Sequence, residues 1–360
     1  MIRRQLTLAA LMPRRIQTAP DVGLRELGLS LIELMIAITL GLLIVAGITV
    51  LIARQSSTRA EFEKASREIE NGRYAMQLLK DDIEHAGFYD QYNPASAVPA
   101  TLPDPCETVS TNLGAALPLP LQGIDAPLSL TGVLSCLADG NHKPGTDIVV
   151  IRRADTTALI PVSSAVAGQP YLQTGQTGSG SAVISAIGTG SDTTPFTLQN
   201  KDGSIASLRK YMVRIYFISP CTTAVSTACA ASDDGGNPVP TLKRLELSTN
   251  GAGATVLTIV PLAEGIDNLQ LDYGLDSATA PDGAPHTFAT APASTPEWSN
   301  VMAVRVNLLA RSTDSSPGYV DGKTYNLGLA GNVGPFNDGF KRHAFSALIR
   351  ATNPSGRREQ

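Results

Sequence analysis

The chain has 360 residues, enough for one large domain or two modest ones, and only 17% of its residues are charged. Residues 1–28 contain five arginines and two acids, so the rest of a chain whose net charge is −4 carries −7. An acidic body argues against a broad nucleic-acid-binding surface, and we expect no nucleic-acid partner, whereas a basic start favours an N-terminus that stays in the cytoplasm.

The first predicted element is an apolar helix. Residues 34–53 form a run of twenty without a charge, followed at once by Arg54. At a rise of about 1.5 Å per residue this run spans roughly 30 Å, the thickness of the hydrocarbon core of a bilayer. A plain secretory signal peptide is the alternative, but its apolar region usually has about 7–15 residues, and a carboxylate such as Glu33 inside the apolar block would be unusual. The pattern therefore predicts one membrane-spanning helix.

The residues ahead of this run carry a resemblance. The sequence GLSLIE at residues 28–33, before a long apolar helix, resembles the type IV prepilin signature, in which a peptidase cuts after the glycine and the new N-terminus is methylated. The resemblance implies cleavage between Gly28 and Leu29 by prepilin peptidase, N-methylation of Leu29, and an assembly role for Glu33. In the family this acid is thought to pair with the terminal amine of a neighbouring subunit. Leu29 departs from the phenylalanine or methionine usual at its place, and an uncleaved anchor is the alternative.

The leader motif and the hydropathy pattern together divide the chain into four expected segments. Residues 1–28 would be the leader, 29–53 the half of the helix in the inner-membrane lipid or the fibre core, 54–87 an amphipathic periplasmic half, and 88–360 a β-rich periplasmic globular domain. The leader is long for this class, and the sequence leaves open whether Met1 or Met12 starts it.

The helix is predicted to continue beyond the membrane. No proline interrupts residues 29–86, Gly87 is a plausible terminator, and His85 is expected to cap the helix end. Such a helix would be about 87 Å long, too long for one globular domain. A coiled coil with a second helix is the alternative to packing on the chain's own sheet, but the glycine and alanine in the apolar stripe offer a partner helix little apolar surface. The apolar stripe expected to pack on the sheet, with charged residues such as Glu68 outside it, consists of Phe62, Ala65, Ile69, Gly72, Met76, Leu79, Ile83 and Ala86.

Beyond residue 88 the pattern is that of β-strands. Residues 89–122 are proline-rich and loop-like, and residues 175–194 and 230–240 read as glycine- and serine-rich loops. The fold class expected is α+β and pilin-like: one long N-terminal helix, its first half transmembrane, packed on an antiparallel β-sheet domain with long loops. The predicted strands are residues 147–152, 211–218, 242–247, 256–260, 266–273, 302–309 and 344–350.

Four blocks of sequence narrow the resemblance. Residues 72–88, 261–274, 301–311 and 342–353 are similar to segments of PilW-type minor pilins, whereas residues 89–209 carry no such resemblance. The resemblance implies a structural subunit that primes type IV pilus assembly at or near the pilus tip. The partners implied are other minor pilins and the major pilin, with a large tip adhesin as a further candidate. Twitching motility and cell adhesion are the processes that such a subunit would serve.

Four cysteines lie beyond the apolar segment, an arrangement typical of disulfides in an oxidising compartment. Four cysteines allow three connectivities, and their count and spacing do not decide among them. As a prediction to be tested, we expect Cys221 to pair locally with Cys229, which leaves Cys106 with Cys136.

No pattern for catalysis, cofactor or metal binding stands out, so we expect a protein that is not an enzyme and binds neither cofactor nor metal. The glycine-rich residues 175–180 lack the lysine of a phosphate-binding loop, and the carboxylates at 233–234 and 267–276 do not match an EF-hand. Calcium in one of these loops is an open alternative. Two other functions stay open: a J-like pseudopilin of type II secretion, and a surface-binding module whose ligand site lies in residues 89–209.

Overall fold

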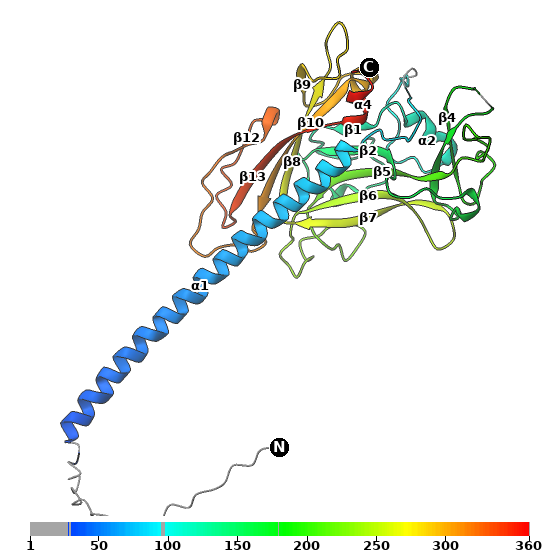
Figure 1. Ribbon diagram of the computed structural model, residues 1–360. Coiled ribbons are helices and arrows are strands. Elements are labelled where there is room, and N and C mark those ends of the chain that lie inside the picture. The colour runs from blue at the N-terminus through cyan, green and yellow to red at the C-terminus, as the bar shows by residue number, and fades with distance from the viewer. Residues whose placement is uncertain (1–27, 29, 95–97, 179, 360) are drawn as a thin grey trace, which may run out of the picture. The chain divides into compact units, whose positions relative to one another are not determined.

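The computed structural model describes residues 28, 30–94, 98–178 and 180–359. The chain divides at Thr58, inside its first helix, into two compact units. Apart from Gly28 and Ser30, the described part of the first unit is the beginning of helix α1 (Leu31–Glu84), and the rest of this helix belongs to the second unit together with every described strand (Figure 1). We call the second unit, Arg59–Gln360, the body.

Helix α1 ends close to the predicted position. Its last residue is Glu84, and His85 to Gly87 form a turn in which the amide of Phe88 donates to the carbonyl of His85 at 3.0 Å. Gly87 has a φ of +73°, a left-handed conformation that glycine adopts without strain, so the predicted terminator is confirmed. The His85 ring nitrogen Nδ1 lies 2.7 Å from the carbonyl oxygen of Asp81, as expected for a side chain that caps the helix end.

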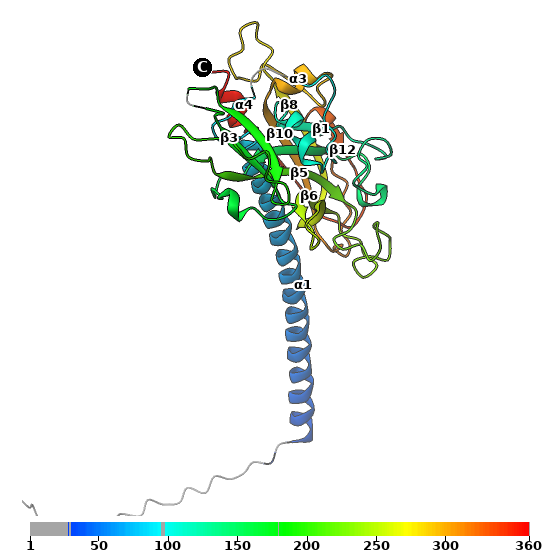
Figure 2. The same cartoon turned by 90° about the vertical axis from the view of Figure 1, so that its right-hand side faces the viewer.

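The larger sheet of the body has seven strands, and all of its pairings are antiparallel. Its main path runs β1-β2-β5-β3-β4, and β6 joins β5 to β7. Strands β1, β3, β5 and β6 of this sheet are labelled in Figure 2. The strands are β1 (Leu121–Ile124), β2 (Ile148–Ala154), β3 (Pro170–Gly175), β4 (Ile184–Thr189), β5 (Leu208–Ser219), β6 (Thr241–Thr249) and β7 (Thr255–Glu264).

A second antiparallel sheet has four strands in the order β13-β10-β8-β9. These are β8 (Ile266–Leu275), β9 (Thr287–Ala289), β10 (Val301–Arg311) and β13 (Arg342–Arg350). A small ribbon pairs β11 (Tyr325–Asn326) with β12 (Asn332–Val333). The short helices are α2 (Ser110–Leu113), α3 (Thr295–Ser299) and α4 (Thr352–Gly356), with single 3₁₀ turns at Gly114–Ala116, Asp139–Asn141, Val162–Ser164 and Gly328–Ala330.

The α+β class is therefore confirmed, and each of the predicted strands is present as β2, β5, β6, β7, β8, β10 or β13. The structure divides them between two sheets where the sequence suggested one. The expectation that residues 175–194 form only a loop is wrong, because β4 lies within them and pairs with β3. Strand β4 reads ISAIGT, and its small residues hide the alternation by which a strand is predicted.

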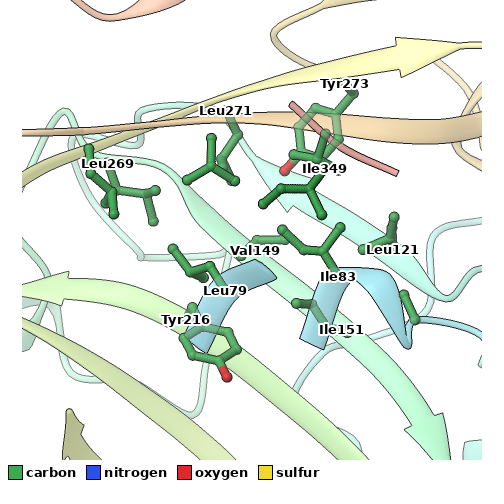
Figure 3. Packing of buried hydrophobic residues seen from close by; sticks show 14 of the residues in the cluster. Leu79, Ile83, Leu121, Val149, Ile151, Tyr216, Leu269, Leu271, Tyr273 and Ile349 are labelled. Carbon is green, nitrogen blue, oxygen red and sulfur yellow. The ribbon is translucent and has the colours of Figure 1, made fainter. Parts of the chain in front are cut away.

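The main core lies where the end of α1 meets both sheets. Leu79 and Ile83 are fully buried and share one cluster with Val149 and Ile151 of β2 and with Leu271 of β8 (Figure 3). Burying a side chain of this kind stabilises the fold by about 1.5–3 kcal/mol. The helix end is therefore an internal part of the body and not an appendage to it.

The second core lies on the other face of the larger sheet. Because neighbouring side chains of a strand point to opposite faces, β2 sends Val149 and Ile151 to the main core and Ile148 and Val150 to the second one. Residues 88–120 and 125–142, which we call the covering segment, flank β1, and their described part closes this face with buried Tyr89, Leu113, Leu117, Leu130, Leu134 and Leu137. All seven residues of β2 are consequently buried.

The predicted stripe on α1 is correct only toward the end of the helix. Gly72, Leu79 and Ile83 are buried, but Phe62 is 73% exposed, and Glu68, predicted to lie outside the stripe, is only 6% exposed. The buried face of the body's helix residues is therefore turned away from Phe62 and includes charged residues. Sequence periodicity missed this because it assigns carboxylates to the solvent side.

Candidate assembly segment and its support in the body

The predicted processing site lies at the edge of the described residues. Leu29 and residues 1–27, which include both candidate start methionines, lie outside them, so cleavage and N-methylation stay predictions. Gly28 is exposed, and a Cβ added there would meet no atom within 4 Å. A larger residue at position 28 therefore meets no steric obstacle within the described chain, and any requirement for glycine there would come from a processing enzyme.

The apolar half of α1 has the properties of a membrane-spanning segment. Among the described residues, α1 is the helix long and apolar enough to cross a membrane, and the apolar window itself is not buried by the rest of the chain. Thr39 and Thr49 donate their hydroxyls to the carbonyls of Ile36 and Val45, at 2.9 and 2.8 Å. Because these hydroxyls are satisfied inside the helix, they cost little in apolar surroundings.

Glu33 lies in the first turn of α1, where the helix dipole favours a negative charge. It is exposed, and among the described residues no ion pair or side-chain hydrogen bond reaches its carboxylate. The geometry leaves this carboxylate available to a group outside its own helix.

Farther along α1, an ion pair joins the helix to the loop that follows β10. The Glu61 carboxylate accepts from Lys341 Nζ at 2.5 Å and from the Ser316 hydroxyl at 2.6 Å. The hydrogen bond from Lys341, followed by that from Ser316, lowers the pKa of Glu61 to about 2. Lys64 adds a bond to the carbonyl of Ser315 at 2.9 Å. The first helical turns of the body are therefore fixed by polar contacts, not by the apolar contacts that the stripe predicted.

A buried charge cluster, which the sequence did not reveal, fixes the end of the helix. Asp82 is 1% exposed and accepts hydrogen bonds from Arg153 Nε at 3.0 Å, Arg214 Nη1 at 2.5 Å and the Tyr216 hydroxyl at 2.5 Å. Burial, together with the Asp82 carboxylate, raises the pKa of Tyr216, so this hydroxyl stays a donor. The cluster ties α1 to β2 and β5, the strands at the centre of the larger sheet.

About four turns before Asp82, the same helix buries a second acid, Glu68, which has no such partners. No side-chain hydrogen bond to Glu68 is present in the described part of the chain, and burial raises its pKa to about 7. One turn farther along the helix, a Cβ on Gly72 would come within 2.2 Å of the Phe345 ring, so this ring of β13 occupies the place of a side chain at position 72.

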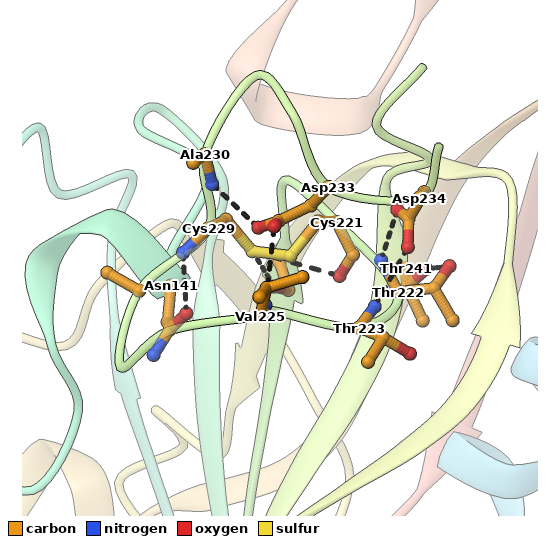
Figure 4. Close-up of a disulfide and its surroundings, with 12 residues drawn as sticks. Asn141, Cys221, Thr222, Thr223, Val225, Cys229, Ala230, Asp233, Asp234 and Thr241 are labelled. Carbon is orange, nitrogen blue, oxygen red and sulfur yellow. Dashed lines mark hydrogen bonds between the residues drawn. A yellow bond between two sulfur atoms is a disulfide. The ribbon is translucent and has the colours of Figure 1, made fainter. Parts of the chain in front are cut away.

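The four cysteines form two disulfides. Cys106 pairs with Cys136 inside the covering segment, and Cys221 pairs with Cys229 after β5, as expected from the sequence. Around the second disulfide, the Asp233 carboxylate accepts the amides of Val225 and Ala230 (Figure 4). Asp234 likewise accepts those of Thr222, Thr223 and Val239. The carboxylates at 233–234, considered above as calcium ligands, are thus engaged by main-chain amides.

The carboxylates at 267–276 are also engaged by protein groups. Asp267 pairs with Lys143 and Arg342, and Asp272 accepts the amide of Leu329 at 3.0 Å. Asp276 and His286 lie close to a further acid, Asp282, with ligand atoms within 4.8 Å of one another, but Asp276 already accepts the amide of Gly283 at 3.0 Å. The arrangement is that of loop-stabilising contacts.

Comparison with known proteins adds one finding. Residues 215–353, which run from within β5 to just past β13, match the family model described as PilW, Type IV Pilus-assembly protein W. The match contains three of the four blocks identified in the sequence and leaves out residues 72–88. No curated protein and no solved structure matches the chain.

Proposed function

We propose that the chain is a minor pilin of the PilW type, a structural subunit that primes type IV pilus assembly at or near the pilus tip. The observation that carries the proposal is that one chain contains both the family match over residues 215–353 and a helix whose apolar part is not buried by the rest of the chain. The proposal assigns the chain a structural role and no catalytic one.

In this proposal, the four segments expected from the sequence have distinct roles. Residues 1–28 are removed by prepilin peptidase, residues 29–53 lie in the inner membrane before assembly and in the fibre core afterwards, and the rest lies in the periplasm. Two disulfides in the body support a periplasmic location, since disulfides persist in oxidising compartments. The partners are other minor pilins, the major pilin and, as a candidate, a tip adhesin.

Glu33 is the proposed assembly residue. Cleavage after Gly28 frees an α-amine at Leu29, and a neighbouring subunit's helix would bring such an amine to the exposed Glu33 carboxylate. A charge pair in apolar surroundings is strong but costly to desolvate, so we expect it to set the register between subunits more than to add stability.

The first experiment determines the mature N-terminus and the stoichiometry together, by mass spectrometry of sheared pili and of inner membranes. We expect a chain that begins with methylated Leu29 and is present in few copies relative to the major pilin. A Gly28→Leu variant should accumulate as full-length precursor, and Gly41→Leu, at a glycine that also has open space around it, is the matched control. A mature chain that begins after Ala46 would instead indicate a plain signal peptide and contradict the prepilin assignment.

A further inference from the structure

The covering segment carries a groove beside the edge of the larger sheet. The groove has a volume of about 450 Å³ and is lined by residues 102–105, by residues 122–124 of β1, and by Gly132, Val133 and Ser135. Strand β1 stands at the end of the path β1-β2-β5-β3-β4, so within the described part of the chain only one of its two edges is paired. The groove therefore lies along an open edge of a sheet.

The pairing register shows which main-chain groups are turned away from β2. The amide of Arg152 donates to the carbonyl of Pro120 at 2.9 Å, which marks those two residues as a hydrogen-bonded pair. Since such pairs alternate along antiparallel strands, Gly123, opposite Val149, turns its amide and carbonyl outward. Among the described residues, no main-chain or side-chain group hydrogen-bonds to the main chain of Gly123. An open donor and acceptor at a strand edge can pair with an added strand.

The walls of the groove define the chemistry of an added strand. Leu102 and Val133 each leave 44% of their side chains exposed, so the groove offers apolar contacts on two sides. The covering segment contains five acids and neither lysine nor arginine, and one of those acids, Asp104, is exposed on the groove wall. Charge complementarity therefore favours a cationic segment over an anionic one.

We propose that this groove, the β1 groove, docks an extended segment of a partner protein that carries alternating apolar and basic side chains. The partner's extended segment hydrogen-bonds to Gly123, packs its apolar side chains on Leu102 and Val133, and places a lysine or arginine near Asp104. This docking site goes beyond the assembly role, lies outside the part of the chain that the family model matches, and does not depend on that role being correct.

The test uses the full chain in detergent micelles and two short fluorescein-labelled peptides, one alternating valine with lysine and the other alternating valine with glutamate. Binding is followed by fluorescence anisotropy. Val133→Lys places a charge in the groove, and Leu128→Lys is the matched control, because Leu128 is 80% exposed in the same segment and does not line the groove. Fluorescence of the single tryptophan, Trp298, reports whether each variant is folded.

We expect the lysine peptide to bind the wild-type chain, with an affinity that falls as salt rises. Val133→Lys should weaken binding by about tenfold or more and Leu128→Lys by less than about twofold. The proposal is overturned if neither peptide binds, if the glutamate peptide binds equally well, or if both variants lose binding alike. It is also overturned if the chain self-associates through this groove, with Val133→Lys abolishing the association, because the occupant would then be a second copy.

Discussion

Asp82 is the residue on which the docking of α1 to the larger sheet should depend most. Changing Asp82→Ala removes the acceptor of Arg153 and Arg214, whose side chains are 8% and 19% exposed, and of the Tyr216 hydroxyl. Removing one partner of a buried ion pair typically costs about 3–5 kcal/mol, because the remaining charge is left unpaired. Arg214 can still reach some water, so we expect a loss of about 3–4 kcal/mol in the free energy of unfolding.

The assay is chemical unfolding of the full chain in detergent, followed by the fluorescence of Trp298. This tryptophan is 2% exposed in the main core and lies 4.7 Å from the Tyr273 ring, so its emission responds to loss of that core. The matched control is Asp81→Ala. Asp81 is the preceding residue, its side chain is 58% exposed, and its ion-pair contact is with His85. We expect the control to lose less than about 1 kcal/mol.

Asp82→Asn separates charge from shape. It keeps one oxygen acceptor while removing the negative charge, so its loss should lie between those of the control and of Asp82→Ala. If Asp82→Ala costs no more than Asp81→Ala, then the cluster contributes no net stability and the proposed role of Asp82 is wrong.

Three further predictions concern assembly, pH and the disulfides. Glu33→Ala should leave membrane anchoring and the folded body intact while reducing the amount of chain in sheared fibres, and equal incorporation of mutant and wild type would refute the role of Glu33. The raised pKa of Glu68, about 7 against 4.5 in the unfolded chain, means that the native state holds the proton more tightly, so stability falls as pH rises from about 4.5 to about 7. Glu68→Gln should therefore gain up to about 3 kcal/mol over wild type between pH 5 and pH 8, and a pH-independent difference in unfolding free energy would contradict this. The disulfides close loops with sequence separations of 30 and 8 residues. Lost loop-closure entropy in the unfolded chain then predicts a stabilisation of about 3.7 kcal/mol from Cys106–Cys136 and of about 2.6 kcal/mol from Cys221–Cys229. Non-reducing peptide mapping first checks the pairing, and the free energies of unfolding of the two paired cysteine-to-alanine variants then test these values.

The helix and the main strands could be predicted because their signals are local. An uninterrupted apolar run, a stripe at helical spacing and a terminating glycine at 87 are all read within a few neighbouring residues. Strand β2 likewise shows as a continuous apolar run, although the sequence did not show that both of its faces are covered.

The supporting charges could not be predicted because their partners are distant in the chain. Asp82 binds side chains 71 and 132 residues away, and Glu61 binds one 280 residues away. Whether an acid on a helix is buried depends on such partners, so periodicity alone placed Glu68 on the wrong side. The covering segment was also missed, because its buried leucines are separated by prolines and glycines and follow no fixed period.

The two-sided burial of β2 has a consequence for how the chain can diverge during evolution. Losing the covering segment would expose Ile148, Val150 and the other apolar residues of the second core. The segment therefore cannot be deleted, or replaced by an unrelated sequence, without exposing this face of the larger sheet. Its backbone and leucines are constrained by the sheet beneath, whereas exposed positions such as Leu128 and Leu102 are free of that constraint. New binding specificity in this protein would therefore arise by substitutions on the outer surface of a retained cover, while the fold beneath it stays unchanged.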